Sequence, residues 1–224
     1  MNRNKECTVG LDTAHQAWNS LWGTEEGRKD WVAVEPDVRD LEKELANLKV
    51  SRVLDLGCGI GRHSLFLASK GFHVFSIDAS SNAVDFTRNA AQEAGLSINV
   101  RQAPMTTLPF EDRYFDYVLA WNVIYHGDPD TVKMVLSEIA RVLRPRGMFQ
   151  GTMLTKRNAY YGKGRQVAHD TYVNDEEDEK KHAHFYCNAK ELAELLSEFD
   201  ILSLYQQKQQ KPGSFHWHYV AERL

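Results

Sequence analysis

The feature that most constrains this chain is a glycine-rich turn that follows a short apolar segment. Residues 52–62 read RVLDLGCGIGR, so an apolar run is followed by glycine at three alternating positions and then by a helical pattern. This order predicts a buried strand that turns sharply into a helix. Glycine permits backbone angles with positive φ and lets a ligand approach where a Cβ would collide. Nucleotide-like ligands bind at such turns, beyond the carboxyl end of a parallel strand.

Strand-like and helix-like segments alternate around and after this turn. Apolar runs predict strands over residues 53–56, 72–77, 98–100, 115–120 and 148–153. Helical periodicity or capping residues predict helices over residues 61–70, 80–94 and 129–143. Such alternation requires right-handed crossovers, and it predicts a parallel sheet covered by helices on both faces. Residues 144–147, which read RPRG, predict a turn before the fifth strand.

Both flanks of this core have their own character. Helical spacing over residues 12–23 and 35–48 predicts two leading helices, whose tryptophans either pack in the core or form a lid over a ligand. The polar and aromatic stretch that follows the core is long and without periodicity, which indicates a functional insertion. A further helix over 188–198 and strands over 201–205 and 216–221 close the chain. We expect a single domain over residues 1–224, divided into an N-terminal helical lid (1–48), a ligand-binding core (49–155), an insertion (156–185) and a C-terminal part (186–224).

Composition excludes several classes of protein. No stretch approaches the roughly 20 apolar residues that a membrane span needs, and no apolar region follows the N-terminus as a signal peptide requires. Cys7, Cys58 and Cys187 are odd in number and lack metal-ligand spacing, so they indicate free thiols in a reducing compartment. A net charge of −4 lowers the expectation of nucleic-acid binding. We expect a cytoplasmic monomer or homodimer with neither a nucleic-acid nor a membrane partner.

An acidic residue at the end of the second predicted strand restricts the class of ligand. Asp78 lies about 20 residues beyond the glycines, where a carboxylate accepts hydrogen bonds from ribose hydroxyls. NAD and S-adenosylmethionine (SAM) both satisfy this pattern. Three features separate them: the first strand carries its own acid, Asp55; the glycines follow G-x-G-x-G rather than G-x-G-x-x-G; and the segment LPFEDRYFD at 108–116 leads into the fourth strand.

Together these segments resemble the class I SAM-dependent methyltransferases. Residues 53–61 are similar to the first signature of that family, and residues 108–116 and 141–147 match later ones in order and spacing. The Trp-rich N-terminus and the segments at 61–63, 125–127 and 216–217 resemble the small-molecule branch that includes tellurite-resistance methyltransferases. The resemblance implies an α/β, Rossmann-like fold. Its seven-stranded sheet has helices on both faces and a last strand inserted antiparallel beside the fifth.

The resemblance also implies roles on the cofactor side. Asp55 would orient the methionine ammonium group directly or through water, Asp78 would bind the ribose diol, and Ala79 would pack against adenine. The chain departs from the family at Ala103-Pro104-Met105, where an Asp usually reads the adenine amino group. Backbone groups near Met105 would then read adenine instead. The expected cofactor-binding residues are Asp55, Gly57, Cys58, Gly59, Asp78, Ala79, Met105 and Trp121, with Cys58 as a small filler rather than a nucleophile.

The acceptor is expected beyond the fourth strand, where residues 121–126 read WNVIYH. His126 and Tyr125 are the candidate catalytic residues, as base or substrate contact, although either side chain can equally be structural. A general base is needed only if the acceptor arrives protonated. Candidate acceptor walls come from the insertion and the last strand: Tyr160, Tyr161, Arg165 and Trp217. Aromatic walls favour a cationic or soft substrate, and an arginine can clamp an anion.

Two histidine pairs raise the question of a metal. His182 with His184, and His216 with His218, place two rings on one face of a strand. No further ligand has suggestive spacing, so we predict no metal site. The sequence predicts an enzyme that transfers a methyl group from SAM to a small molecule and releases S-adenosylhomocysteine. The alternatives are a methyltransferase acting on RNA or protein, and a non-catalytic SAM-binding partner subunit, the latter suggested by the missing acid near Pro104.

Overall fold

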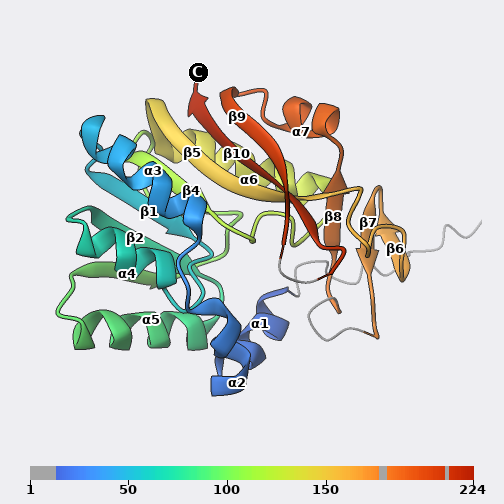
Figure 1. Cartoon of the computed structure of the whole chain (residues 1–224), viewed down its shortest axis with the longest axis horizontal. Coiled ribbons are helices and arrows are strands. Elements are labelled where there is room, and N and C mark those ends of the chain that lie inside the picture. The colour runs from blue at the N-terminus through green and yellow to red at the C-terminus, as the bar shows by residue number, and fades with distance from the viewer. Residues whose placement is uncertain (1–13, 177–180, 210–211) are drawn as a thin grey trace, which may run out of the picture.

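The computed structural model describes residues 14–176, 181–209 and 212–224 (Figure 1). Cys7 and the first two residues of the predicted helix 12–23 lie outside these ranges. The helices are α1 (Ala14–Trp22), α2 (Glu25–Arg28), the 3-10 turn η1 (Lys29–Trp31), α3 (Pro36–Asn47), α4 (Arg62–Ser69), α5 (Ser81–Glu93), α6 (Pro129–Val142) and α7 (Ala189–Leu195). The strands are β1 (Arg52–Leu56), β2 (His73–Asp78), β3 (Ile98–Gln102), β4 (Phe115–Ala120), β5 (Leu143–Thr155), β6 (Arg165–Ala168), β7 (Thr171–Val173), β8 (His184–Cys187), β9 (Phe199–Lys208) and β10 (Phe215–Arg223).

Seven of these strands form the main sheet, in the order β3-β2-β1-β4-β5-β10-β9. Strands β1 to β5 are mutually parallel. β10 runs antiparallel between β5 and β9, with Trp217 opposite Met153. The predicted α/β sheet with an antiparallel strand beside the fifth is therefore confirmed. Parallel order places the carboxyl ends of β1, β2 and β4 at one edge, where ligands bind in open α/β sheets.

The structure corrects two expectations about the later strands. Residues 144–147 do not form a separate turn but belong to β5, where they bulge outward: Leu143 pairs with Phe115, and Met148 pairs with Tyr117. Arg146 takes a φ of 61° within this bulge. The insertion is also more regular than expected, because it folds into the antiparallel strands β6, β7 and β8. β8 joins the end of β5, which makes one continuous sheet of ten strands.

Side chains that alternate along the strands build a core on each face of the sheet. Leu54 and Val118 face one core, which is completed by α6 and α7. Val53 and Leu119 point the other way into a second core, which is completed by α3 and α4. This alternation is the reason that helices cover both faces, since the central strands β1 and β4 are buried on both sides.

The N-terminal helices lie over the edge of the sheet where the strands end. In Figure 1, α1 and α2 lie together beside one end of α5. The Oδ1 atom of Asn19 in α1 accepts hydrogen bonds from the Ser80 hydroxyl at 2.8 Å and from the Asn82 backbone amide at 3.1 Å. These bonds fix α1 to the start of α5. None of the helices in the described ranges is both long and apolar enough to cross a membrane.

Candidate active site

The glycine turn after β1 is shaped by close packing as well as by backbone angle. Gly57 and Gly59 have φ values of 68° and 54°. A Cβ built on Gly57 would lie 2.3 Å from Cγ2 of Val123, and one on Gly59 would lie 3.2 Å from the Trp22 ring. A side chain at Gly57 is therefore excluded both by conformation and by the loop that follows β4.

Asp78 at the end of β2 holds this turn in place. Its Oδ2 atom accepts a hydrogen bond from the Gly59 backbone amide at 2.9 Å, and its Oδ1 atom accepts one from the Ser80 amide at 2.8 Å. Burial raises the pKa of Asp78, while these backbone amides act in the opposite direction. The carboxylate thus reaches the cavity from the position that binds a ribose diol in nucleotide-binding α/β folds.

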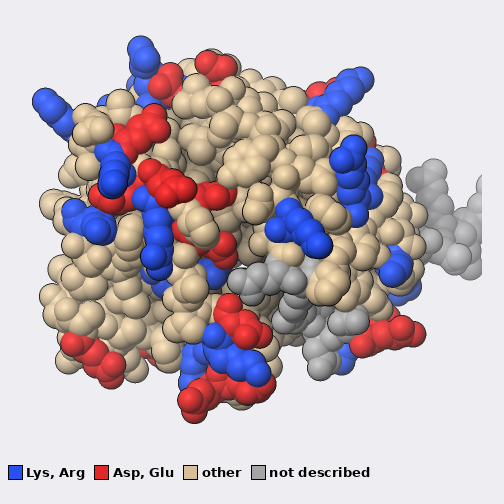
Figure 2. Space-filling view, in the orientation of Figure 1, with Lys and Arg blue, Asp and Glu red and all other residues tan. Residues whose placement is uncertain are grey.

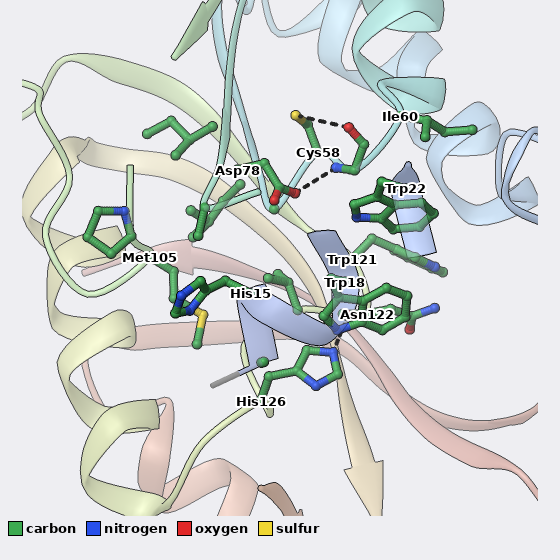
Figure 3. A pocket seen from close by; sticks show the side chains of 18 of the residues that line it. His15, Trp18, Trp22, Cys58, Ile60, Asp78, Met105, Trp121, Asn122 and His126 are labelled. Atoms are coloured by element: carbon green, nitrogen blue, oxygen red, sulfur yellow. Dashed lines mark hydrogen bonds between the residues drawn. The ribbon is translucent and has the colours of Figure 1, made fainter. Parts of the chain in front are cut away.

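A cavity opens above the turn and encloses about 940 Å³ of space, part of it open to solvent. Residues from the N-terminal helices, the glycine turn, β2, the loop after β3 and the loop after β4 line it: Ala14, His15, Trp18, Trp22, Trp31, Leu56, Gly57, Cys58, Gly59, Ile60, Arg62, His63, Ile77, Asp78, Ala79, Ala103, Pro104, Met105, Thr106, Trp121, Asn122, Val123 and His126. Figure 3 shows Cys58 and Asp78 at one end of the cavity and His126 at the other.

Three tryptophans cover the cavity. The rings of Trp18 and Trp22 stack with centroids 5.1 Å apart, and Trp31 meets both edge-on, at 5.3 and 5.6 Å. The guanidinium of Arg62 lies 5.5 Å from the Trp31 ring centroid and forms an ion pair with Glu35 at 3.1 Å. The N-terminal tryptophans therefore both pack together and line the ligand space, which joins the two interpretations that the sequence left open.

Asp55 does not line the cavity but lies beneath its floor. Its side chain is buried, and its Oδ2 atom accepts a hydrogen bond from the Ser64 hydroxyl at 2.5 Å. Ser64 in turn accepts one from Ser76 at 2.8 Å. Burial raises the pKa of Asp55 to about 6, and the Ser64 hydrogen bond opposes this rise. The geometry makes Asp55 a support for the turn between β1 and α4, while its expected contact with the methionine ammonium group stays a prediction.

The other expected cofactor residues surround the space. Gly57, Cys58, Gly59, Asp78, Ala79, Met105 and Trp121 all line the cavity. Burial raises the pKa of the Cys58 thiol well above its ordinary value, so this cysteine is a neutral filler at neutral pH. The loop Ala103-Pro104-Met105 lines the same cavity, and the recognition of adenine by its backbone groups stays a prediction.

The loop after β4 is held rigidly. Asn122 has a φ of 57°, and its backbone amide donates to Thr152 Oγ1 at 2.8 Å. The backbone carbonyl of Asn122 lies 3.0 Å from Nε2 of His126, so this nitrogen carries the proton. His126 lines the cavity, as expected for a catalytic candidate. Tyr125 does not: it is buried with its ring centroid 4.6 Å from that of His126 and 5.6 Å from that of His216.

The expected acceptor walls lie elsewhere. None of Tyr160, Tyr161, Arg165 and Trp217 lines the cavity. Tyr161 donates to Asp170 at 2.7 Å and packs against Tyr172, whereas Trp217 donates to the Cys187 carbonyl at 3.0 Å. Arg165 is exposed at the start of β6. The insertion, which carries Tyr160, Tyr161 and Arg165, folds back on itself as the strands β6, β7 and β8. Trp217 on β10 is held instead at the Cys187 carbonyl, so none of the four residues reaches the cavity.

Several cavity residues were missed by the sequence reasoning. His15, Arg62 and His63 line the cavity without having been named as site residues, whereas Asn122 and Val123 line it from within the segment 121–126 that was expected beside the acceptor. Their places in the sequence could have identified them as cavity residues. Arg62 and His63 directly follow the glycine turn, and Asn122 and Val123 follow the end of β4. Residues next to the carboxyl ends of parallel strands face the ligand crevice.

The residues present suit SAM. The turn excludes a Cβ at Gly57, Asp78 reaches the cavity, and the cavity is lined mostly by apolar side chains, as small-molecule sites are. Bound SAM would meet Gly57 and Gly59 with its methionine part, Asp78 with its ribose and the loop around Met105 with its adenine, as the family resemblance implies.

Comparisons with known proteins agree with this geometry. Residues 53–147 match a family described as a methyltransferase domain. A ubiquinone biosynthesis O-methyltransferase of Hahella chejuensis is 33% identical over 135 residues, which are 60% of this chain and 54% of that protein. A tRNA N(3)-methylcytidine methyltransferase of Drosophila melanogaster is 27% identical over 148 residues, covering 60% of this chain and 46% of that protein. The chain spans about half the length of the first curated relatives it matches.

Solved structures share the fold. A SAM-dependent methyltransferase from Methanosarcina mazei superposes with a TM-score of 0.71 at 22% identity, covering 85% of this chain and 98% of that one. A 1,6-didemethyltoxoflavin N1-methyltransferase from Burkholderia thailandensis, solved with its substrate and S-adenosylhomocysteine, gives 0.69 at 24% identity, covering 94% and 88%. TehB from Haemophilus influenzae gives 0.65 at 16% identity, covering 88% and 65%. Residues 53–147 therefore match a methyltransferase domain, and the chain has the fold of solved SAM-dependent methyltransferases.

Proposed function

We propose that this protein transfers a methyl group from SAM to a small-molecule acceptor. The observation that carries the proposal is the enclosed cavity between the glycine turn and the tryptophan cover, with Asp78 at one end and His126 at the other (Figure 3). A cover of three packed rings suits a small acceptor that enters the cavity, rather than a base displayed on a long polymer. When bound, SAM supplies an electrophilic methyl group on a sulfonium sulfur and leaves as S-adenosylhomocysteine.

The chain's own part in this reaction is chiefly alignment. Holding the acceptor atom in line with the reactive bond removes roughly 7–11 kcal/mol of entropic barrier in well-oriented reactions. Asp78 and the glycine turn fix one end of the cavity, and the loop after β4 fixes the other through Asn122 and Thr152. Trp18, Trp22 and Trp31 supply apolar walls for the space between.

The relatives support the class of reaction more than the identity of the acceptor. The ubiquinone biosynthesis and toxoflavin enzymes act on small molecules by their names, and they favour the same assignment here. The tRNA methyltransferase keeps a second candidate open, an RNA acceptor. Charge favours the first candidate, because the chain carries a net charge of −4 and, over the left half of the face drawn in Figure 2, acidic side chains lie among the basic ones.

The compartment is part of the proposal. Cys58 and Cys187 are both buried free thiols, which suits the reducing environment of a cytoplasm. A small metabolite of the same compartment is then the acceptor we propose.

Isotope tracing tests this function directly. The purified protein is incubated with methyl-deuterated SAM and a cell extract, and small molecules are separated from macromolecules before mass spectrometry. Label in a small metabolite supports the proposal and identifies the acceptor. Label in RNA or protein would replace it with the second candidate. SAM binding without any transfer of label would favour the non-catalytic partner subunit.

A further inference from the structure

Three buried histidines meet at the end of the cavity that lies opposite the glycine turn. His126, His182 and His184 are 5%, 2% and 1% exposed. Their ring centroids lie 4.3 to 4.8 Å apart, and one nitrogen from each ring lies within 4.8 Å of the others. The sequence showed only the pair His182 and His184. The third member comes from the loop after β4, 56 residues earlier than His182.

The backbone brings these two segments together. The Phe185 amide in β8 donates a hydrogen bond to the Tyr125 carbonyl at 3.0 Å. This bond connects the insertion to the loop that carries His126. The contact is therefore built into the sheet rather than made by side chains alone.

Hydrogen bonds to main-chain carbonyls fix the tautomers of two of the rings. Nε2 of His126 faces the Asn122 carbonyl at 3.0 Å, and Nδ1 of His184 faces the His182 carbonyl at 2.8 Å. A nitrogen that faces a carbonyl carries the proton, so neutral His126 and His184 have their lone pairs on Nδ1 and Nε2. Metal-bound histidines almost always donate their other ring N–H to a carbonyl or carboxylate in this way.

The spacing also suits an ion. Nε2 of His182 donates a hydrogen bond of 2.9 Å to Nδ1 of His126, and an ion bound by both nitrogens would take the place of that proton. Two nitrogens bound to one zinc ion at 2.0–2.1 Å lie roughly 2.9 to 3.4 Å apart for bond angles between a right angle and tetrahedral. The third nitrogen has to move inward by on the order of 1 Å to reach the same distance, which a ring rotation provides.

We propose that His126, His182 and His184 bind one divalent first-row transition-metal ion, zinc in the first instance, and that this ion binds the acceptor through an oxygen or sulfur atom. The binding of the ion does not depend on the proposed methyl transfer, whereas the binding of the acceptor to the ion rests on it. Three protein ligands leave a fourth position, as in catalytic zinc sites. His126 lines the cavity, and His182 lies under the cover, with its ring centroid 6.4 Å from that of Trp18.

The charge of the proposed ion indicates which class of acceptor would bind to it. Three imidazole ligands carry no negative charge of their own, so they do not reduce the double positive charge of the ion, and the sulfonium of bound SAM would add a further positive charge to the same cavity. An anionic oxygen or sulfur, from a phenol, an enol or a thiol, supplies the missing charge. The acceptor loses its proton to solvent as it binds; its lone pair then forms the bond to the methyl carbon, and the sulfur–carbon bond breaks with its electrons left on sulfur.

A second cluster of potential ligands is already neutralised by the protein. His169, Asp170 and Glu191 lie close enough to share an ion. The Nζ atom of Lys156, however, lies 2.7 Å from Asp170 and 2.6 Å from Glu191. The lysine supplies the positive charge there, so we assign no metal to that cluster.

Cobalt binding tests the proposal without depending on turnover. Metal-free full-length protein is titrated with Co²⁺, and the visible ligand-field band of low-coordinate cobalt is recorded. We expect one ion per chain and a new thiolate-to-cobalt charge-transfer band when mercaptoethanol is added. X-ray absorption of the zinc-loaded wild type then counts the bound imidazoles, and three are expected. If the wild-type protein gives no ligand-field band, the proposed metal site is wrong. The three histidines would then be neutral side chains joined by hydrogen bonds.

Variants give the second arm of the test. His182→Ala and His184→Ala should each weaken Co²⁺ binding by more than about 100-fold, whereas His73→Ala, an exposed histidine at the start of β2, should leave it unchanged. Equal affinity in all three variants would overturn the assignment of ligands. SAM titrations of the metal-free and zinc-loaded protein separate the two proposals. Failure to bind SAM contradicts the proposed function, and failure to bind metal contradicts only this inference.

Discussion

The substitution Asp55→Asn should change how the stability of the protein depends on pH. Asp55 is 2% exposed, and burial raises its pKa from an ordinary 3.8 to about 6. A rise of this size corresponds to roughly 3 kcal/mol, at 1.36 kcal/mol per pH unit. At neutral pH the ionised carboxylate therefore costs the folded state about that much, because the charged group is kept from water. Asn has nearly the same shape and no charge, so it removes this cost.

Because the pKa of Asp55 is raised in the folded state, its contribution to the free energy of unfolding decreases as the pH rises. A carboxyl group whose pKa is higher in the folded state stabilises that state fully below about pH 4, and this contribution is lost as the pH rises through about 6. The free energy of unfolding of the wild type minus that of Asp55→Asn should thus fall by roughly 3 kcal/mol between pH 3 and pH 8. The buried His63, whose lowered pKa gives the opposite slope, cancels in this difference.

Urea denaturation at several pH values measures the effect. The new amide N–H group needs an acceptor, and failure to find one costs about 1–3 kcal/mol. That cost lowers the free energy of unfolding of Asp55→Asn by the same amount at every pH, so it does not change how the difference from the wild type depends on pH. Asp85→Asn is the matched control, since its exposed side chain should change the free energy of unfolding by no more than about 0.5 kcal/mol. A difference between wild type and Asp55→Asn that stays constant with pH would refute the argument from burial.

Two further substitutions examine the turn and its cover. Gly57→Ala should destabilise the protein by roughly 2–5 kcal/mol, since it combines a left-handed backbone angle with a Cβ 2.3 Å from Val123. Gly71→Ala, with φ of 91° and no atom within 4 Å, should lose only about 1–2 kcal/mol, so equal losses in urea denaturation would contradict the steric role of Gly57. Trp22→Ala should weaken SAM binding about three- to tenfold by removing the ring stacked on Trp18, and unchanged affinity in a fluorescence titration would show that the cover does not touch the cofactor.

The sequence predicted the parts of the site that depend on local order along the chain. The glycine turn, Asp78 and the loop around Met105 each directly follow a strand, and parallel order brings all strand ends to one edge. The short strands β6 and β7 were invisible, because three or four residues are too few for a period-2 pattern to stand out. For the same reason the insertion was read as irregular.

What could not be predicted depends on contacts between distant segments. Tyr161 and Trp217 were expected at the cavity, but each finds its hydrogen-bond partner, Asp170 and the Cys187 carbonyl, away from it. The approach of His126 to His182 depends on the pairing of β8 with the loop after β4, which spacing in the sequence does not encode.

Calorimetric titration of SAM into the wild type and Asp78→Ala tests whether the cofactor binds in this cavity with its ribose at Asp78. We expect the wild type to bind one SAM. Loss of a carboxylate that accepts from ribose hydroxyls, at about 1.5–3 kcal/mol per charged hydrogen bond, should weaken binding by about a hundredfold or more. Asp78→Asn serves as the near-isosteric companion, since Asp78 also holds the Gly59 and Ser80 amides. A wild type that does not bind SAM, or a well-folded Asp78→Ala that binds it with unchanged affinity, would contradict the placement of the cofactor in this cavity.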